Sequence, residues 1–127
     1  MWDLAEDKAS IALIEAFYNA GKPVGAVCHG PVVLQRAKYR AEPLVKGKRV
    51  SAFTNEEEAA VGLTHVVPFL LEDELKRLGG LFERGPTWQS FAIVDGRLVT
   101  GQNPNSSSAA AQKLLELLQG NTAGRAK

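Results

Sequence analysis

The chain has 127 residues, of which 45% are hydrophobic and 23% are charged, and this composition is typical of one globular domain. Fifteen basic and fourteen acidic residues leave a net charge of +1 without a dense basic run, which argues against nucleic acid as a partner. No apolar stretch reaches the roughly 20 residues that cross a bilayer, and the opening segment is acidic where a signal peptide would be basic. We therefore expect a cytoplasmic protein with no membrane partner.

The first half of the chain alternates between helix and strand patterns. Apolar residues recur at three- and four-residue steps over 4–18, which predicts an amphipathic helix. The run VGAVC at 24–28 has no polar alternation, as in a parallel strand that is buried on both faces. A Gly-Pro pair then favours a helix over 30–38, since proline is tolerated in a first turn. A second buried strand is predicted over 49–53, followed by a helix that begins in the polar cluster TNEEE.

The second half ends in a hairpin and a helix. Helical spacing over 69–78 stops at two glycines, and acidic residues precede basic ones as the helix dipole favours. The segment 91–101 predicts two short strands around Asp95-Gly96, and Asn105 or Ser106 can cap a final helix. We expect one domain over 1–120 and a flexible tail over 121–127.

Cys28, the only cysteine, lies where the first predicted strand becomes a helix. Ala26 and Gly30 stand two residues before and after it, so the pattern resembles the G-x-S-x-G turn that exposes a nucleophile. A lone cysteine is more often a buried space-filler, but this turn favours the nucleophile. The amide end of the following helix is expected to favour the thiolate. One cysteine and two histidines argue against a disulfide or a structural metal site.

His29 follows the cysteine and is the candidate base. The second predicted strand ends at the same sheet edge, so Glu56, Glu57 or Glu58 can bind its imidazole. For at least two of these three glutamates we expect a solvated helix start instead. His65 is expected to be structural or at the surface. Trp2 and Trp88 are expected to pack in the core or at its rim, where an aromatic ring can also shape a small pocket.

Four segments, KPVGAVCHGPVVL, GKRVSAFTNEEE, VPFLLEDELKRLGG and DGRLVTGQNPNSS, together resemble the ThiJ/PfpI superfamily, whose fold is class I glutamine amidotransferase-like. Within it they resemble the heat-shock-protein branch of cofactor-independent glyoxalases (glyoxalase III), which act in stress response. The resemblance covers nearly the whole chain. It implies an α/β fold, a flavodoxin-like three-layer sandwich with a mostly parallel sheet, plus a C-terminal hairpin and helix.

The resemblance also implies an activity. In that branch the cysteine attacks the aldehyde carbon of methylglyoxal, and the hemithioacetal is converted to lactate without glutathione, metal or another cofactor. Cys28 matches this nucleophile, His29 matches the neighbouring histidine, and Glu58 matches the acid that orients the histidine. The expected function is therefore a glyoxalase (lyase) or a deglycase that acts on small aldehydes, with the His29 backbone N–H facing the developing oxyanion.

The sequence departs from the family at its front. The family carries an opening section with the first strands, a glutamate that touches the sulfur and a GGHG segment, whereas this chain begins at MWDL. We expect an N-terminally truncated fold with impaired turnover, in which strand 24–28 has one bare edge. A homo-oligomer or a complementing chain is then the expected partner.

Two other functions are compatible with the same residues. The same Cys-His-Glu set can serve a cysteine hydrolase of the amidotransferase or peptidase class. A non-catalytic role, as a chaperone or a redox-responsive protein, is the other alternative.

Overall fold

A computed structural model describes residues 1–126, and Lys127 lies outside the described residues. The chain forms both helices and strands, as the sequence predicts, and four of the strands have only two residues. In chain order, with η for 3₁₀ helices, the elements are α1 (Lys8–Asn19), β1 (Val24–Val27), η1 (Gly30–Leu34), β2 (Lys38–Tyr39), β3 (Glu42–Pro43), β4 (Arg49–Val50), α2 (Asn55–Ala60), α3 (Leu71–Arg77), β5 (Leu81–Phe82), β6 (Ala92–Asp95), β7 (Leu98–Gly101), η2 (Pro104–Ser106) and α4 (Ser107–Ala126).

The central sheet has the strand order β1-β7-β6. β1 runs parallel to β7, and β6 and β7 form the predicted antiparallel hairpin, whose turn contains Gly96 at φ +59°. β4 pairs in parallel with β5, and β2 pairs with β3 in a short hairpin. The sheets are thus mixed rather than uniformly parallel.

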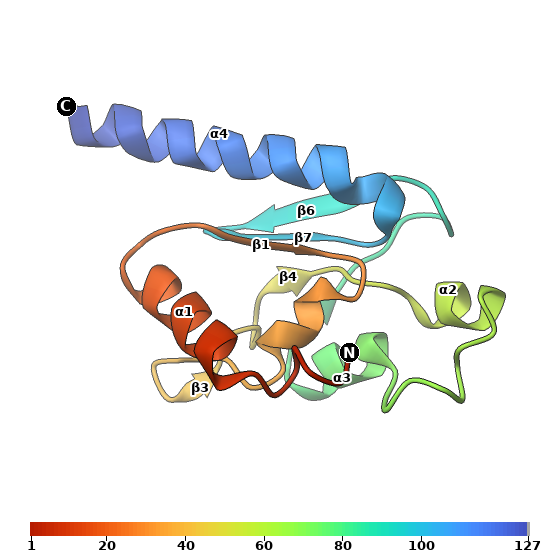
Figure 1. Ribbon diagram of the computed structural model, residues 1–127. Coiled ribbons are helices and arrows are strands. Elements are labelled where there is room, and N and C mark those ends of the chain that lie inside the picture. The colour runs from red at the N-terminus through yellow and green to blue at the C-terminus, as the bar shows by residue number, and fades with distance from the viewer. Residues whose placement is uncertain (127) are drawn as a thin grey trace.

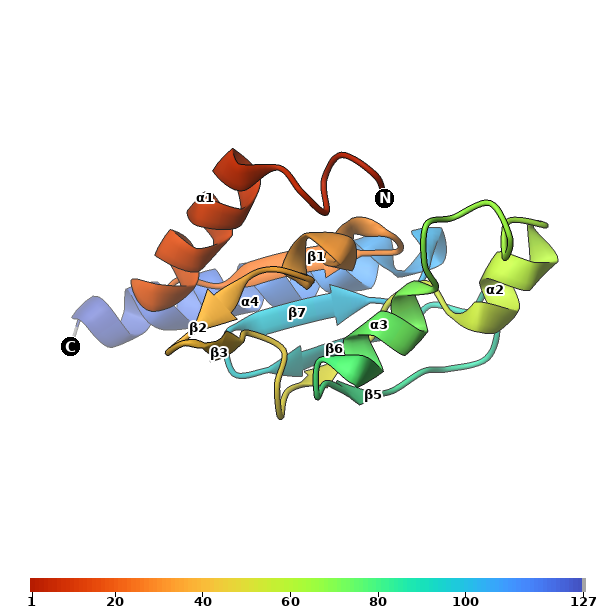
Figure 2. The same ribbon diagram turned by 90° about the horizontal axis from the view of Figure 1, so that it is seen from below.

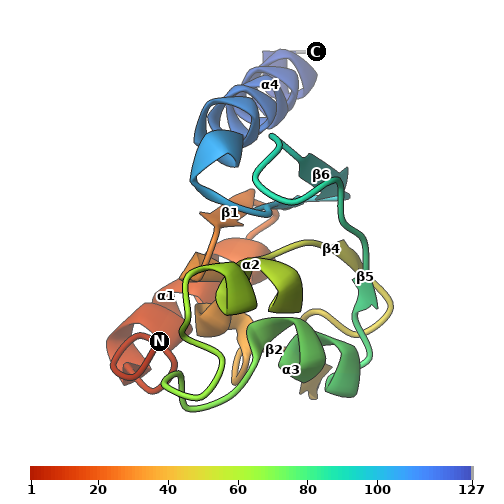
Figure 3. The same cartoon turned by 90° about the vertical axis from the view of Figure 1, so that its right-hand side faces the viewer.

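The elements form the layers of a flavodoxin-like sandwich, as predicted. Helix α4 covers one face of the central sheet, while α1, η1, β4 and α3 lie on the other side (Figures 1 and 3). The main core lies on this second side, which Figure 2 shows from below. Residues 31–34 of η1 are all buried, and Val32, Val33 and Leu34 belong to the same core cluster as Leu75 of α3 and Leu98 of β7. This packing fixes the segment that follows the Cys28 turn.

Polar contacts join β4 and the segment after it to the central sheet. The backbone N–H of Ser51 donates to Thr100 Oγ1 at 2.8 Å, and the N–H of Phe53 donates to the carbonyl of Cys28 at 2.9 Å. The end of this segment therefore lies beside the end of β1. This agrees with the prediction that the two strands end at the same edge of the sheet. The ordered strand is shorter than predicted, since only Arg49 and Val50 pair with β5.

Two helix predictions need correction. The first helix begins at Lys8 rather than at residue 4, because the Asp7 side chain accepts from the N–H of Ser10 at 3.0 Å and caps the helix there. The predicted helix over 30–38 is wrong beyond Leu34, where only the short η1 forms before the chain enters β2. β-Branched valines in η1 disfavour a longer α-helix, and all of its apolar side chains are already buried.

β1 lies at an edge of the central sheet. The prediction that 24–28 is buried on both faces is wrong, since Gly25 is exposed. Among residues 1–126, β7 is the one strand that pairs with β1.

The C-terminal helix α4 continues through Ala126, past the predicted domain end at residue 120. The division into a domain and a flexible tail stays a prediction, and its last residue lies outside the described part of the chain. Within that part, no helix combines the length and apolarity that crossing a bilayer requires.

Candidate active site

Cys28 occupies a strained turn at the end of β1. Its φ is +60°, in the left-handed region that residues other than glycine rarely adopt. Two backbone hydrogen bonds hold it there: its N–H donates to the Gly101 carbonyl at 2.9 Å, and its carbonyl accepts from Phe53 at the same distance. The side chain remains partly accessible. The turn thus presents the sulfur as a nucleophile elbow does.

His29 and Glu58 complete a relay that starts at this sulfur. His29 Nδ1 lies 3.5 Å from Cys28 Sγ, and His29 Nε2 lies 2.8 Å from Glu58 Oε2. Glu58 is only 1% exposed, and its carboxylate can accept but not donate, so we assign the imidazole proton to Nε2. Nδ1 then directs its lone pair at the thiol. All three predicted residues lie together, while their catalytic roles stay a prediction.

The pKa of the Cys28 thiol is raised, whereas the sequence predicted a thiolate. Burial raises the pKa of Cys28, the charges of Glu57 and Glu58 raise it further, and a hydrogen bond from the His29 backbone N–H lowers it less than these raise it. The expectation that a helix end favours the thiolate is therefore wrong. The helix that follows is only the five-residue η1, and two carboxylates lie close to the sulfur.

The imidazole packs against one aromatic ring, which in turn packs against a second. The ring of Phe53 lies 4.3 Å from that of His29, and the ring of Trp88 lies 5.6 Å from that of Phe53. Trp88 also has a positive φ of +65°, so its backbone is held in an unusual conformation beside the site. Trp88 therefore lies next to the site, in contact with Phe53. Trp2, in contrast, is 56% exposed and does not belong to the core.

Glu57 is buried, and its carboxylate accepts hydrogen bonds from three segments near the site, at Thr54, Trp88 and residues 102–103. Its Oε2 accepts from the Trp88 N–H at 2.9 Å, Gln102 Nε2 at 3.1 Å and Asn103 Nδ2 at 2.8 Å. Its Oε1 accepts from the Thr54 N–H at 3.1 Å. Burial alone would raise the pKa of Glu57, but these hydrogen bonds outweigh it and hold the pKa below its ordinary value.

The expectation that at least two of the three glutamates are solvated is wrong. Only Glu56 is exposed, where it pairs with Arg84 at 2.7 Å. Glu57 and Glu58 are both buried. The spacing Thr54-x-x-Glu57 is that of a capping box, which forms here, and this spacing could have indicated a structural role of Glu57 from the sequence. His65 is exposed, as predicted.

Comparison with known proteins identifies the family of this site. A model described as the DJ-1/PfpI family matches residues 2–117. The chain belongs to the DJ-1/PfpI family. This is the ThiJ/PfpI group that the sequence motifs predicted, and the match covers both the Cys28 turn and the segment that carries Glu58.

Two curated relatives within the DJ-1/PfpI family resemble the chain along most of its length. Glyoxalase 3 of Candida albicans is 32% identical over 125 residues, which cover 92% of this chain and 52% of the relative. The glutathione-independent glyoxalase HSP31 of Saccharomyces cerevisiae is 35% identical over 123 residues, which cover 91% of this chain and 51% of the relative. The chain thus spans about half the length of the curated relatives it matches.

A solved structure supports the fold. The crystal structure of glyoxalase III from Candida albicans superposes with a TM-score of 0.87 and 28% identity, over 91% of this chain and 52% of that one. This DJ-1/PfpI chain therefore shares the architecture of that structure over the matched half.

Proposed function

We propose that this chain carries the thiol half of a glutathione-independent glyoxalase site and converts methylglyoxal or a related α-oxoaldehyde to a hydroxy acid. The observation that carries the proposal is the relay from Cys28 Sγ through His29 to buried Glu58. The names of the two curated relatives, both glyoxalases, support this substrate class over others.

The first step is addition of the thiol to the aldehyde. Sγ forms a bond to the aldehyde carbon, the thiol proton passes to His29 Nδ1, and the carbonyl electron pair moves onto oxygen. Because the pKa of the thiol is raised, proton removal must accompany the attack, and Glu58 stabilises the resulting imidazolium. The His29 backbone N–H, which bonds the sulfur at rest, is the donor we assign to the oxyanion.

The second step is an internal redox shift. The aldehyde carbon loses its hydrogen as a proton while the neighbouring ketone carbon gains one, so the first carbon becomes a thioester and the second an alcohol. Water then cleaves the carbon–sulfur bond, which releases the hydroxy acid and restores the thiol. We assign this proton shift to His29, whose Nδ1 lies 3.5 Å from the sulfur.

Lactate formation from methylglyoxal without glutathione tests the proposal. The unaltered chain should form lactate, whereas Cys28→Ser and Cys28→Ala should form none above the uncatalysed rate. Val66→Ala, at an exposed position outside the described site, serves as the control and should retain the full rate. Lactate formation that survives Cys28→Ser would remove the thiol from the mechanism.

Cys28 would also be the reactive group of a hydrolase or an oxidant sensor, and further assays distinguish these two functions from a glyoxalase. Release of ammonia from glutamine, or cleavage of a peptide, would indicate a hydrolase instead, since a Cys-His-Glu set also performs acyl transfer. An oxidant sensor needs a low-pKa thiolate, and the raised pKa of Cys28 works against that role.

A further inference from the structure

Segment 85–89, which carries Trp88, belongs to no helix or strand. Side chains that follow β7 hold its two ends. Gln102 Oε1 accepts from the N–H of residue 85 at 2.8 Å. Asn103 Nδ2 donates to the carbonyl of residue 89, also at 2.8 Å. Both amide side chains are buried, so the segment is fixed beside the site by contacts other than secondary structure.

Within this segment, Trp88 has a strained backbone. Its φ of +65° lies in the left-handed region, which is unfavourable for a bulky residue. Its N–H donates to Glu57 Oε2 at 2.9 Å, and its carbonyl accepts from Asn105 Nδ2 at 2.6 Å. Strain of this kind persists only where the surroundings over-determine the conformation, and it concentrates at functional sites. Trp88 is therefore a candidate for a role in the site.

The ring of Trp88 reaches the relay through Phe53. Trp88 and Phe53 pack edge to face, with ring centroids 5.6 Å apart and ring planes at 65°. Phe53 in turn packs against the imidazole of His29, with ring centroids 4.3 Å apart. Phe53 is only 4% exposed, so its ring is confined by its neighbours. Removal of the Trp88 ring would open space into which Phe53 can move, away from the imidazole.

The imidazole of His29 needs this support because its hydrogen bonds fix only part of its orientation. Glu58 holds Nε2 at 2.8 Å, but one hydrogen bond leaves the ring free to turn about it. The contact from Nδ1 to Cys28 Sγ is already 3.5 Å long, so a small rotation breaks it. A catalytic group must be held to within about 10–20° of its productive orientation. The packing of Phe53 on the imidazole restricts this rotation.

We propose that Trp88 is a positioning residue for His29. Glu57 and Asn105 act through Trp88, because they hold its backbone. The ring of Trp88 keeps Phe53 against the imidazole, and Nδ1 stays directed at the sulfur. The catalytic consequence rests on the proposed function, whereas the orientation of His29 can be measured without any substrate.

Nitrogen NMR of the histidine rings tests the inference. The chain has two histidines, and His65→Gln, at an exposed position, assigns the remaining signals to His29. At mildly alkaline pH we expect two well-separated ring signals in the unaltered chain, from a protonated Nε2 and a bare Nδ1. Trp88→Gly removes the ring, while glycine adopts the positive φ without strain. In this variant the separation of the two signals should fall at least twofold, because a mobile imidazole exchanges between tautomers.

Two further variants sharpen this comparison. Trp88→Phe keeps an aromatic ring against Phe53 and should restore most of the separation. Asn105→Ala, at an exposed position, loosens the Trp88 backbone and should change the His29 signals in the same direction as Trp88→Gly. In a chain that already carries Trp88→Gly, Asn105→Ala should have no further effect, since it acts through the missing ring.

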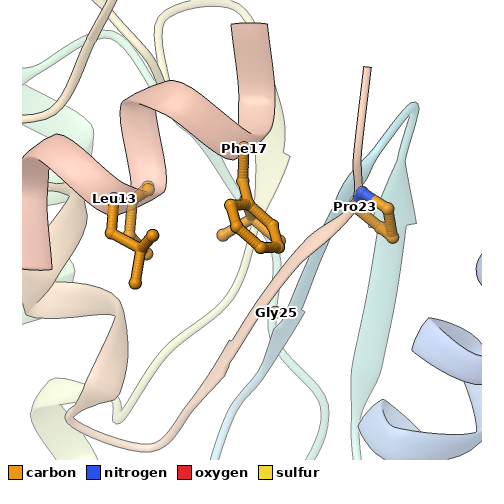
Figure 4. A pocket seen from close by; sticks show the side chains of 6 residues that line it. Leu13, Phe17, Pro23 and Gly25 are labelled. Carbon is orange, nitrogen blue, oxygen red and sulfur yellow. The ribbon is translucent and has the colours of Figure 1, made fainter. Parts of the chain in front are cut away.

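Phe17→Ala is the matched control. It deletes a ring of α1 that is 42% exposed and lines an apolar hollow of about 170 Å³ between α1 and β1 (Figure 4). None of the residues that line this hollow belongs to the relay. Phe17→Ala should therefore leave the signals of His29 unchanged.

Lactate formation gives the catalytic measurement. In Trp88→Gly we expect kcat to fall at least tenfold while KM changes less than twofold, because a positioning residue affects proton transfer rather than substrate binding. Trp88→Phe should recover most of kcat. If the unaltered chain forms no lactate but the signals of His29 still depend on Trp88, the proposed function is refuted and the positioning role is supported.

Two results would overturn the inference. The signals of His29 could stay unchanged in Trp88→Gly, in a chain that urea titration shows to be folded. If that variant does not fold, unchanged signals in Asn105→Ala overturn the inference instead. Alternatively, KM could rise in Trp88→Gly while kcat is retained, which would assign the ring to substrate binding rather than to positioning.

Discussion

At the scale of single residues, the site combines a strained thiol with buried carboxylates. Cys28 is held at a positive φ by backbone bonds to Gly101 and Phe53, so its position does not depend on its own side-chain packing. Glu58 orients His29, and Glu57 holds the neighbouring backbone. Burial raises the pKa of the Cys28 thiol, and the charges of the same carboxylates raise it further.

Alkylation of Cys28 by iodoacetamide should need a higher pH than alkylation of an unstructured cysteine peptide. A raised pKa leaves a smaller thiolate fraction at neutral pH, so the rate at pH 7 falls below that of the peptide and its plateau shifts upward. Glu58→Gln removes one negative charge and should shift the profile back toward lower pH. Because the chain has one cysteine, the label is unambiguous. A plateau at or below the peptide's pH would contradict the raised pKa.

Glu57 should stabilise the fold above acid pH. Glu57→Ala removes the acceptor for several buried donors and should cost about 3 kcal/mol of unfolding free energy in urea at pH 7. Since the folded-state pKa of Glu57 is lowered, its contribution is complete above the unfolded-state pKa and is lost as pH falls through the folded-state pKa. Glu57→Gln should therefore flatten the acid side of the stability curve. An equal effect of Glu116→Gln, at an exposed position in α4, would refute this assignment.

At the scale of elements, the hairpin and the strand before Cys28 could be predicted because local signals agree there. Asp95-Gly96 marks the turn, and apolar runs mark both strands. The predictions of the helix over 30–38 and the strand over 49–53 were wrong in length, because tertiary contacts determine the structure of these segments. The segment after Cys28 packs wholly into the core as η1, and residues 51–53 bond singly to Thr100 and Cys28 rather than extending β4. A linear pattern contains neither of these contacts.

The close approach of β1 and β7 requires glycine at position 101. A Cβ there would lie 2.8 Å from Val27 Cγ1 and 3.0 Å from Ser106 Cβ. Gly101→Ala should therefore cost about 1–3 kcal/mol by overpacking and displace the carbonyl that holds the Cys28 N–H. Gly120→Ala is the matched control, because that site in α4 is open and alanine should stabilise the helix by up to about 1 kcal/mol. Urea titration of both variants measures the difference, and equal midpoints would disprove the close approach.

At the scale of the whole molecule, the chain spans about half the length of its DJ-1/PfpI relatives, and among residues 1–126 the central sheet has β1 and β6 as its edge strands. The sequence motifs predicted the family and brought Cys28, His29 and Glu58 together. They could not show that Glu57 binds the Trp88 backbone rather than His29, because these residues meet through contacts between segments distant in sequence.

Carbon NMR of methylglyoxal labelled with ¹³C at its aldehyde carbon tests the central claim most directly. With the unaltered chain we expect a tetrahedral carbon signal from the adduct on sulfur, which then decays as lactate forms. Cys28→Ser should lack that signal, and Glu58→Gln should form it more slowly because His29 loses its orienting carboxylate. Identical spectra from the unaltered chain and Cys28→Ser would contradict a thiol that attacks the aldehyde.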